Sequence, residues 1–561
     1  MKVKTPWYDS YKGMRKHLRY PNHSLYTQLR EAIKKYPDNV ALKYFNKDTT
    51  YEQLDIKIRR CSHALIANGV RPGDVVTICM PNTPECVIMF YALNRIGAVA
   101  SIIHPLAAEN EIKRYLEISD SKMILVINVA LEKIENIISD TRVFKVIVVT
   151  PSDSMPIVKK TAYNQTVARL SNKVKESARF TSWKKFMRSA EEYTGKINEK
   201  VVGRDVACIL YSGGTTGEPK GILLTNKGIN AISIQAVEAI GNLSDQDSLL
   251  AILPMFHGFG LAIGVHTTLC LGATDVLIPQ FSVNTFHRLL NKYEPTVIVG
   301  VPTLFEALLK NKHMKNIDLS YLRHIICGGD SLSVGLKKRT DAFLHEHGCF
   351  EQVREGYGLT ETVTACTVMP TGQYRENSIG LPFPDVYVKI VKPYTQVEVA
   401  YGEVGEICVA TVGMMVGYLN DELETARVLQ RHRDGMLWLH TGDLGTMDKD
   451  GFTYFKQRLK RMIISSGYNV YPQFIENIID EFDGVLMSTV IGVPDAYRGM
   501  APKAFVVLKN KVKPNESFKR ALREHCRKNL AKYEMPTRFV FKKSLPKTLV
   551  GKVNYRELEK E

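Results

Sequence analysis

At 561 residues the chain is too long for a single hydrophobic core, so we expect two or three domains. Hydrophobic residues make up 45% and charged residues 24%, which is ordinary for a folded globular protein. No run of about 18 apolar residues occurs, so we expect no transmembrane helix. The ten cysteines are scattered without Cys-x-x-Cys spacing, which argues against a zinc site or a disulfide framework and favours a cytoplasmic protein.

The formal net charge of +17 is concentrated in two segments, residues 1–36 and 151–188. Each segment carries nine Lys/Arg against two acidic residues. A basic surplus can indicate nucleic-acid binding. Neither segment contains a recognition motif or an aromatic–basic platform, so we expect no nucleic-acid partner. A solvated face that attracts anionic ligands explains the charge equally well.

Strand-like runs alternate with helical patterns in the first part of the chain. Apolar runs at Val75–Ile78, Met123–Val126 and Phe144–Val149 predict strands, and the pattern of Tyr51–Ala67 predicts a helix. This alternation predicts an α/β fold with layered, mainly parallel sheets. Residues 151–200 break it, because they are polar, basic and poor in strand formers.

Beyond Arg458 the pattern changes to a compact α+β arrangement. We expect a helix from about Pro472 to Phe482, a strand at Ala504–Leu508 and a helix from about Ser517 to Ala531. The predicted organisation is a large domain over residues 1–457, with a basic insertion at about 151–200, followed by a small domain over residues 458–561.

The segment Tyr211–Gly221, with the sequence YSGGTTGEPKG, lies between two apolar runs that predict strands. Its glycines let backbone N–H groups approach a ligand, its hydroxyl side chains add donors, and Lys220 adds a positive charge. This combination suits a polyphosphate. The segment is not a Walker A motif, which needs Gly-x-x-x-x-Gly-Lys-Ser/Thr followed by a helix. Without further motifs, a Gly/Ser/Thr loop between strands is more typical of a flexible hairpin.

The Thr-Thr-Gly-x-Pro-Lys-Gly run resembles the phosphate loop of the adenylate-forming (ANL) superfamily, which includes acyl-CoA synthetases, nonribosomal adenylation domains and beetle luciferases. The other motifs of that superfamily follow in order: Leu253–Gly260 (LPMFHGFG), Gly356–Glu361 (GYGLTE), Gly402–Glu406 (GEVGE), Thr441–Asp443 (TGD), Arg458–Lys460, Ser466–Pro472 and Pro546–Lys552 (PKTLVGK). With Leu25–Leu29 and Thr50–Leu54, the resemblance covers almost the whole chain.

The resemblance implies that ATP activates a carboxylic acid as an acyl-AMP, with Mg²⁺ as cofactor and coenzyme A as co-substrate. It implies these positions: Ser212, Gly213, Gly214, Thr215, Thr216, Gly217 and Lys220 for the β- and γ-phosphates; Thr360 for the α-phosphate; Glu361 and Thr216 for Mg²⁺; Gly328, Gly329, Asp330, Gly356, Tyr357 and Gly358 for adenine; Asp443 and Arg458 for the ribose; and His257, Gly258 and Phe259 for the acyl pocket. Lys552 would bridge the carboxylate and the α-phosphate, as a catalytic residue alongside Thr360, Glu361 and His257. Each residue also has a simpler interpretation, such as a turn former for Asp443 or a surface lysine for Lys552.

The resemblance further implies a hinge at Lys460, about which the small domain rotates, and a coenzyme A channel lined by Ser466, Gly467 and Tyr468. One motif has a second interpretation, since Gly-Gly-Asp-Ser-Leu at 328–332 is also the phosphopantetheine attachment sequence of carrier domains, with Ser331 as the modified residue. It directly follows a predicted strand and lies between the other motifs, so we reject the carrier interpretation.

The N-terminal layout and the long middle insertion most resemble bacterial-type fatty acyl-CoA ligases. Gly258 beside Phe259 leaves room for a bulky or long acyl group, so we expect a medium- to long-chain fatty acid, with an aromatic acid second. Two other classes stay open: an adenylation enzyme that loads a separate carrier protein, and a nucleotide or acyl-AMP sensor without catalysis. The sensor is disfavoured because it would not need a bridging lysine at position 552.

The basic segment at about 155–188 has an apolar stripe at helical spacing. Tyr163, Val167, Leu170 and Val174 form the stripe, Trp183 and Phe186 follow it, and most of the lysines and arginines lie off it. A basic amphipathic helix with aromatic residues is typical of a segment that lies on an anionic membrane surface. A helix packed on its own domain would show the same stripe, so both interpretations remain.

Overall fold

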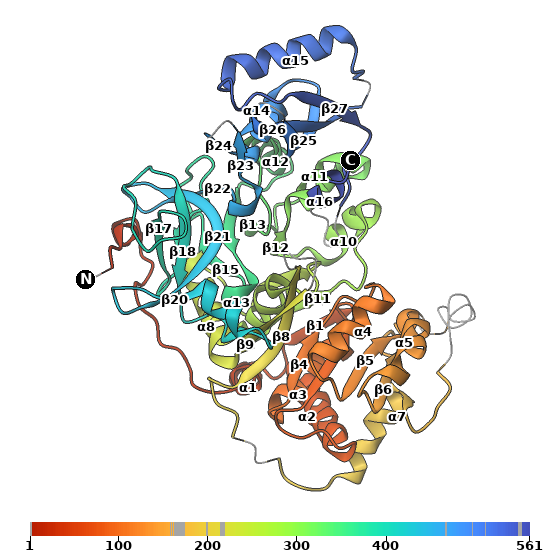
Figure 1. Ribbon diagram of the computed structural model, residues 1–561. Helices are drawn as coiled ribbons and strands as arrows, with labels where there is room; N and C mark the ends of the chain where they lie inside the picture. Colours follow the sequence, from red (N-terminus) through yellow and green to blue (C-terminus); the bar gives the residue numbers. More distant parts are fainter. Residues whose placement is uncertain are drawn as a thin grey trace.

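The computed structural model describes residues 3–156, 159, 161, 174–197, 200–213, 219–465, 468–495, 498–510, 512–547 and 553–561. Among these residues the strands form four sheets (Figure 1). Two large sheets and a smaller antiparallel sheet make up the first part of the chain, and a fourth sheet belongs to the C-terminal part. The predicted α/β fold, with mainly parallel layers and a small α+β unit at the C-terminus, is therefore confirmed.

The first large sheet carries the hairpin that precedes and follows the predicted phosphate loop. In the described residues its strand order is β19 (Gly417–Tyr418), β9 (Pro219–Thr225), β8 (Val206–Gly213), β4 (Val99–Ile102), β3 (Val75–Cys79), β5 (Met123–Ile127), β6 (Lys145–Val149) and β7 (Phe180–Ser182). The strands from β8 to β7 pair in parallel, and β9 and β19 are antiparallel additions. Strands β3, β5 and β6 are nearly continuous runs of buried apolar residues, as expected for a sheet covered on both faces.

The second large sheet carries the predicted adenine segments. Its order in the described residues is β16 (Leu381–Pro382), β15 (Ala365–Val368), β14 (Val353–Gly358), β13 (His324–Cys327), β12 (Val297–Gly300), β10 (Ser248–Ala251), β11 (Thr274–Leu277), β1 (Val40–Tyr44) and β2 (Lys47–Thr50). The strands from β14 to β1 are parallel, so their carboxyl ends meet at one edge. Ligands bind at such edges in open α/β sheets.

Helices cover these sheets. They include α1 (Leu25–Lys35), α2 (Tyr51–Ala67), α3 (Pro84–Arg95), α4 (Glu109–Ile118), α5 (Leu131–Ile137), α7 (Trp183–Arg188), α8 (Asn226–Ile240), α9 (Thr268–Leu271), α10 (Phe286–Tyr293), α11 (Pro302–Lys310), α12 (Val334–Glu346) and α13 (Glu422–Val428). Helix α2 has the bounds that the sequence predicts. It begins there because Thr50 and Gln53 form a capping box, in which each side chain binds the backbone N–H of the other residue.

The antiparallel sheet consists of β17 (Tyr387–Val391), β18 (Gly405–Ala410), β21 (Leu437–Met447) and β20 (Leu429–Arg431), with β22 (Thr453–Arg458) paired to β21. In Figure 1 it lies beside the second large sheet, on the side of the N-terminus. Strand β22 ends at Arg458, which the short 3₁₀ helix η9 (Leu459–Arg461) follows. The predicted hinge residue Lys460 thus lies at the exit from this sheet.

The C-terminal part has a hydrophobic core of its own, which includes Ile463, Val470, Ile475 and Val506. Its sheet consists of β24 (Tyr468–Val470), β23 (Ile463–Ser465), β26 (Gly499–Leu508), β25 (Val485–Asp495) and β27 (Arg538–Lys542), and its helices are α14 (Pro472–Glu481), α15 (Glu516–Asn529) and α16 (Tyr555–Leu558). Helix α15 lies on the face turned away from the rest of the molecule (Figure 1). The domain boundary near Arg458 stays a prediction.

The basic insertion differs from the sequence prediction in part. The segment expected to interrupt the α/β pattern contains β7, which pairs with β6 and extends the first sheet, and the helix α7. Trp183 and Phe186 of α7 are buried in the core, so for these two aromatic residues the structure agrees with the packed-helix interpretation. Tyr163, Val167 and Leu170 lie outside the described residues. Within the described ranges, no helix is long and apolar enough to cross a membrane.

Candidate active site

Strands β8 and β9 hold the two ends of the predicted phosphate loop. They form an antiparallel hairpin in which Ser212 lies opposite Lys220 and Gly213 opposite Pro219. Gly214, Thr215, Thr216 and Gly217 lie outside the described residues, so their expected roles stay predictions. The described ends bring the Ser212 and Lys220 positions together at one end of the hairpin.

Lys220 belongs to a chain of contacts that reaches the Gly-Tyr-Gly-x-Thr-Glu motif. Its ammonium group lies 2.6 Å from Glu424 Oε1 on α13 and 4.9 Å from the centre of the Tyr418 ring. The Tyr418 hydroxyl donates a hydrogen bond of 2.9 Å to Glu361 Oε1. The predicted phosphate-binding lysine and the predicted Mg²⁺ ligand are therefore joined through Tyr418, a residue that the sequence analysis did not single out.

Glu361 stands on a strained turn. The short 3₁₀ helix Thr360–Thr362 is followed by Val363, whose φ of +66° is rare for a β-branched residue. Such a conformation costs about 1–3 kcal/mol and persists only where the surroundings enforce it. The carboxylate of Glu361 offers a hard oxygen ligand, the kind that Mg²⁺ prefers. In the described residues, no group of three or more His, Cys, Asp or Glu side chains is arranged to hold a metal ion.

The predicted acyl-pocket segment packs directly against this turn. A Cβ atom on Gly258 would lie 1.8 Å from the carbonyl oxygen of Val363, so only glycine fits there. Phe259 begins a π-helix, η5 (Phe259–Thr267), a form often found at functional sites. The His257 backbone N–H donates to the Pro254 carbonyl at 3.1 Å. His257, Gly258 and Phe259 thus lie beside the turn that contains Thr360 and Glu361.

The predicted adenine segments lie at the carboxyl ends of the neighbouring parallel strands β13 and β14. A Cβ atom on Gly328 would lie 3.2 Å from the Gly356 carbonyl oxygen and 3.3 Å from Cε1 of Phe259, so the two segments and the acyl-pocket segment meet here. Gly329 has a φ of +79°, which favours glycine. Asp330 is exposed, and its carboxylate accepts from the Ser331 N–H.

Tyr357 and Arg458 both bind the carboxylate of Asp443. The Tyr357 hydroxyl donates to Oδ2 at 2.7 Å, and Arg458 Nε lies 2.8 Å from Oδ1. The Asp443 side chain is 1% exposed, and a buried carboxylate needs such partners. Burial and the Asp443 charge raise the pKa of the Tyr357 hydroxyl, and the same charge raises the pKa of Arg458. All three positions were predicted for adenosine, and the structure joins them.

The predicted hinge residue Lys460 lies close to Lys220. Burial, and next the positive charges of Arg427, Lys220 and Arg556, lower the pKa of Lys460, while Glu424 opposes this shift. Arg556 lies on α16, directly after the predicted catalytic motif. Tyr468 belongs to β24, where its backbone pairs with Ser465. Ser466, Gly467 and Lys552 lie outside the described residues, so the coenzyme A channel and the bridging lysine stay predictions.

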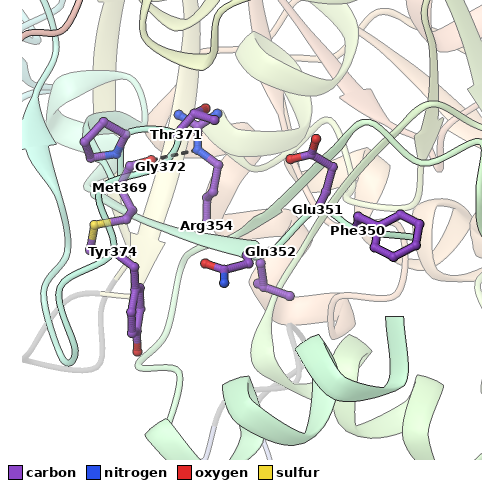
Figure 2. A pocket seen from close by; sticks show the side chains of 10 residues that line it. Phe350, Glu351, Gln352, Arg354, Met369, Thr371, Gly372 and Tyr374 are labelled. Atoms are coloured by element: carbon purple, nitrogen blue, oxygen red, sulfur yellow. Dashed lines mark hydrogen bonds between the residues drawn. The ribbon is translucent and has the colours of Figure 1, made fainter. Parts of the chain in front are cut away.

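A separate cavity of about 410 Å³ lies at the other end of β14. It is lined by Phe350, Glu351, Gln352, Val353, Arg354, Met369, Pro370, Thr371, Gly372 and Tyr374 (Figure 2). Its buried Arg354 donates to the carbonyl oxygens of Met369, Ile240 and Ala239. These bonds cap the end of α8, so the guanidinium group has a structural role. The cavity is formed at the amino end of β14, whereas Tyr357 lies at the carboxyl end.

The chain matches the family described as AMP-binding enzyme over residues 29–419 and the AMP-binding enzyme C-terminal domain over residues 475–552. It therefore belongs to the AMP-binding enzymes, which confirms the resemblance inferred from the motifs.

Curated relatives include a long-chain-fatty-acid–CoA ligase of Bacillus subtilis (strain 168), 32% identical over 100% of this chain and 99% of that protein. A ligase of the same name from Haemophilus influenzae is 32% identical over 99% and 98%. Among solved structures, the anthranilate CoA ligase AuaEII in complex with anthranoyl-AMP has a TM-score of 0.83 at 24% identity, covering 97% of this chain and 98% of that one. The ATP-bound chimera of RpMatB and BxBclM has a TM-score of 0.83 at 25% identity, covering 96% and 98%.

The contact between Gly258 and Val363 gives a stability prediction. We expect Gly258→Ala to lower the free energy of unfolding by about 1–3 kcal/mol, because the new methyl group overpacks against a backbone carbonyl. Gly264 in the same π-helix is the matched control, since its Cβ would meet only the Phe259 oxygen at 3.7 Å. Urea denaturation followed by circular dichroism measures both variants. Equal midpoints would show that the turn after Glu361 is not held by Gly258.

Proposed function

We propose that this AMP-binding enzyme is an ATP-dependent acyl-CoA synthetase. It activates a carboxylic acid as acyl-AMP, releases pyrophosphate, and transfers the acyl group to coenzyme A. The observation that supports this most is the joining of Tyr357, Asp443 and Arg458 beside the turn that carries Thr360 and Glu361. An adenylating enzyme needs polar groups that bind the ribose, next to a site for the phosphates and a pocket for the acyl group.

In the first half-reaction an oxygen of the carboxylate attacks the α-phosphorus of ATP, and pyrophosphate leaves. Both reactants are anions, so the site must supply positive charge where they meet. We assign Lys220 and Ser212 to the β- and γ-phosphates, Thr360 to the α-phosphate, and Lys552 to the bridge between carboxylate and α-phosphate. Mg²⁺ bound at Glu361, with Thr216, would neutralise charge on the phosphates.

Asp443 would accept hydrogen bonds from the ribose hydroxyls, while Tyr357 and Arg458 hold its carboxylate in place. Gly328, Gly329 and Asp330, with Gly356 and Gly358, would let the backbone lie against adenine. The acyl group would occupy the space beside His257, Gly258 and Phe259.

In the second half-reaction the thiol of coenzyme A attacks the acyl carbonyl, and AMP leaves. Lys552 cannot stay at the carboxylate and also admit a thiol from the same side. We propose that the small domain rotates about Lys460 between the half-reactions and brings Ser466, Gly467 and Tyr468 to the pantetheine channel. Such closure and opening steps are common in enzymes and proceed in microseconds to milliseconds.

For the acid we propose a medium- to long-chain fatty acid. The names of the relatives from Bacillus subtilis and Haemophilus influenzae support this choice, together with the coverage of nearly the whole chain by both alignments.

ATP–pyrophosphate exchange across saturated acids of 2 to 18 carbons, with benzoate and a cinnamate as aromatic probes, tests the proposal. We expect exchange to peak with medium or long chains and to be weak with acetate and with both aromatic acids, because each methylene that an apolar pocket buries adds about 0.8 kcal/mol. Coenzyme A alone should then yield the thioester. A peak with an aromatic acid would make the enzyme an aromatic acid–CoA ligase, and exchange without thioester formation would indicate a carrier-loading enzyme.

Lys552→Ala should separate the half-reactions. We expect it to reduce acyl-AMP formation by about 100-fold or more, because one charge-stabilising donor in a preorganised site contributes on that order. The variant should still convert supplied acyl-AMP and coenzyme A to acyl-CoA at near the wild-type rate. Lys547→Ala, at an exposed lysine five positions before Lys552, serves as the control. Near-normal acyl-AMP formation by Lys552→Ala would contradict the assignment.

We further propose that the reaction takes place in the cytoplasm, with peripheral contact to anionic membrane through the 155–188 segment. Free thiols at the ten cysteines support a reducing compartment. Because Trp183 and Phe186 are buried, the contact would rest on the basic charge of the segment and on the stripe that begins at Tyr163.

Flotation with vesicles that contain anionic phospholipid tests this contact. Reversal of Lys159, Lys160, Lys173 and Lys175 to Glu should abolish recovery with the vesicles, because each basic residue near an anionic surface contributes about 1 kcal/mol. Reversal of the exposed Arg520, Arg523, Lys528 and Lys532 in and after α15 changes the net charge equally and should not reduce recovery. Equal behaviour of both variants would favour a segment packed on its own domain.

A further inference from the structure

Glu406 closes the Gly402–Glu406 motif, to which the proposed mechanism gives no role. It lies on β18, the neighbour of the strand β21 that carries Asp443. Its side chain is 6% exposed. A buried carboxylate without polar partners would be costly, so the partners of Glu406 indicate what it does.

Strands β18 and β21 are not regularly paired at this point. Glu406 lies opposite Leu444 and Cys408 opposite His440, so only one residue of β18 faces the three residues from Thr441 to Asp443. The surplus residues form a bulge, with Gly442 at a φ of +68°. A bulge removes partners from backbone groups, and those groups then need other acceptors.

Side chains supply these acceptors. The Gly442 N–H donates to Glu406 Oε1 at 3.0 Å, and the Asp443 N–H donates to Thr441 Oγ1 at 3.0 Å. The Thr441 hydroxyl in turn donates to the Ile407 carbonyl at 2.6 Å. Glu406 therefore fixes the residue directly before Asp443, from the strand behind it.

The second oxygen of Glu406 is held by a pair of histidines. Oε2 lies 2.9 Å from His440 Nδ1, and His440 Nε2 lies 3.0 Å from His432 Nε2. The carboxylate can only accept, so Nδ1 of His440 carries a proton. In neutral His440 the other nitrogen must then accept from His432 Nε2–H. Burial and the nearby Lys389 charge lower the pKa of His432 to about 4, which agrees with a neutral ring.

This cluster does not have the geometry of a metal site. The two Nε2 atoms face each other at hydrogen-bond distance, so they do not converge on a common point. Among the described residues, no cluster of His, Cys, Asp and Glu qualifies as a metal site. His432, His440, Glu406 and Gly442 instead form a continuous line of hydrogen bonds, in which both His440 and the Gly442 N–H donate to Glu406.

We propose that Glu406, held by His440 and His432, is a positioning residue for nucleotide binding. It keeps the Thr441–Asp443 bulge in the shape that presents the Asp443 carboxylate to the ribose hydroxyls. This inference rests on the proposed role of Asp443, and it adds that the orientation of Asp443 is set from the strand behind it as well as by Tyr357 and Arg458.

Isothermal titration calorimetry without acid substrate tests the proposal through the ratio of the Kd for 2′-deoxy-ATP to the Kd for ATP. The wild type should prefer ATP, because 2′-deoxy-ATP lacks one hydroxyl that Asp443 would accept from. Glu406→Met is similar in length but has no acceptor oxygen, and we expect it to lower the ratio about five- to tenfold. Glu406→Gln should keep the ratio within about twofold, since its amide oxygen still accepts from the Gly442 N–H.

Two further variants make the outcome decisive. Glu403→Ala removes an exposed carboxylate of the same motif and should leave the ratio unchanged. Asp443→Asn should reduce the ratio if Asp443 binds the ribose.

A reduced ratio in Asp443→Asn with a normal ratio in Glu406→Met would overturn the inference and leave the proposed function standing. An unchanged ratio in Asp443→Asn would overturn the ribose assignment itself, and the inference with it. If Glu406→Met does not fold, Glu406→Ala takes its place under the same criteria.

Discussion

The buried carboxylate of Asp443 is the interaction on which the arrangement of the site depends. Tyr357 from the second large sheet and Arg458 from β22 both bind this carboxylate. Asp443 and Arg458 are also cross-strand partners, so the ion pair closes the end of the β21–β22 pairing. Arg458 directly precedes η9 with Lys460. The same ion pair thus joins the proposed ribose site to the segment that carries the predicted hinge residue.

A second line of contacts joins Lys220 to Glu361, the residues proposed for the phosphates and Mg²⁺. Tyr418 places its hydroxyl on Glu361 and its ring face beneath the Lys220 ammonium group, while Glu424 neutralises that lysine. Charged groups that are already oriented need little reorganisation when the substrate arrives. If Lys220 binds phosphate as proposed, the phosphate replaces Glu424 as the anionic partner of the lysine.

The sequence was sufficient to predict much of this architecture, because local signals agree with the fold. The capping box at Thr50 and Gln53 places the start of α2, and the ordered motifs identify Tyr357, Asp443 and Arg458 as members of one site. The contact between Tyr418 and Glu361 could not be predicted, since 57 positions separate the two residues and the sequence analysis did not single out Tyr418. The apolar stripe before Trp183 and Phe186 is equally ambiguous, because periodicity identifies a face that needs covering and does not reveal whether protein or lipid covers it.

The most direct test of the central claim, that the assembled residues catalyse attack of a carboxylate on the α-phosphorus, follows an oxygen atom. A fatty acid labelled with ¹⁸O at its carboxylate is converted with ATP and coenzyme A, and the products are examined by mass spectrometry. Adenylation followed by thiolysis leaves one labelled oxygen on AMP and none on pyrophosphate. Label in orthophosphate or pyrophosphate, or unlabelled AMP alongside acyl-CoA, would contradict the mechanism.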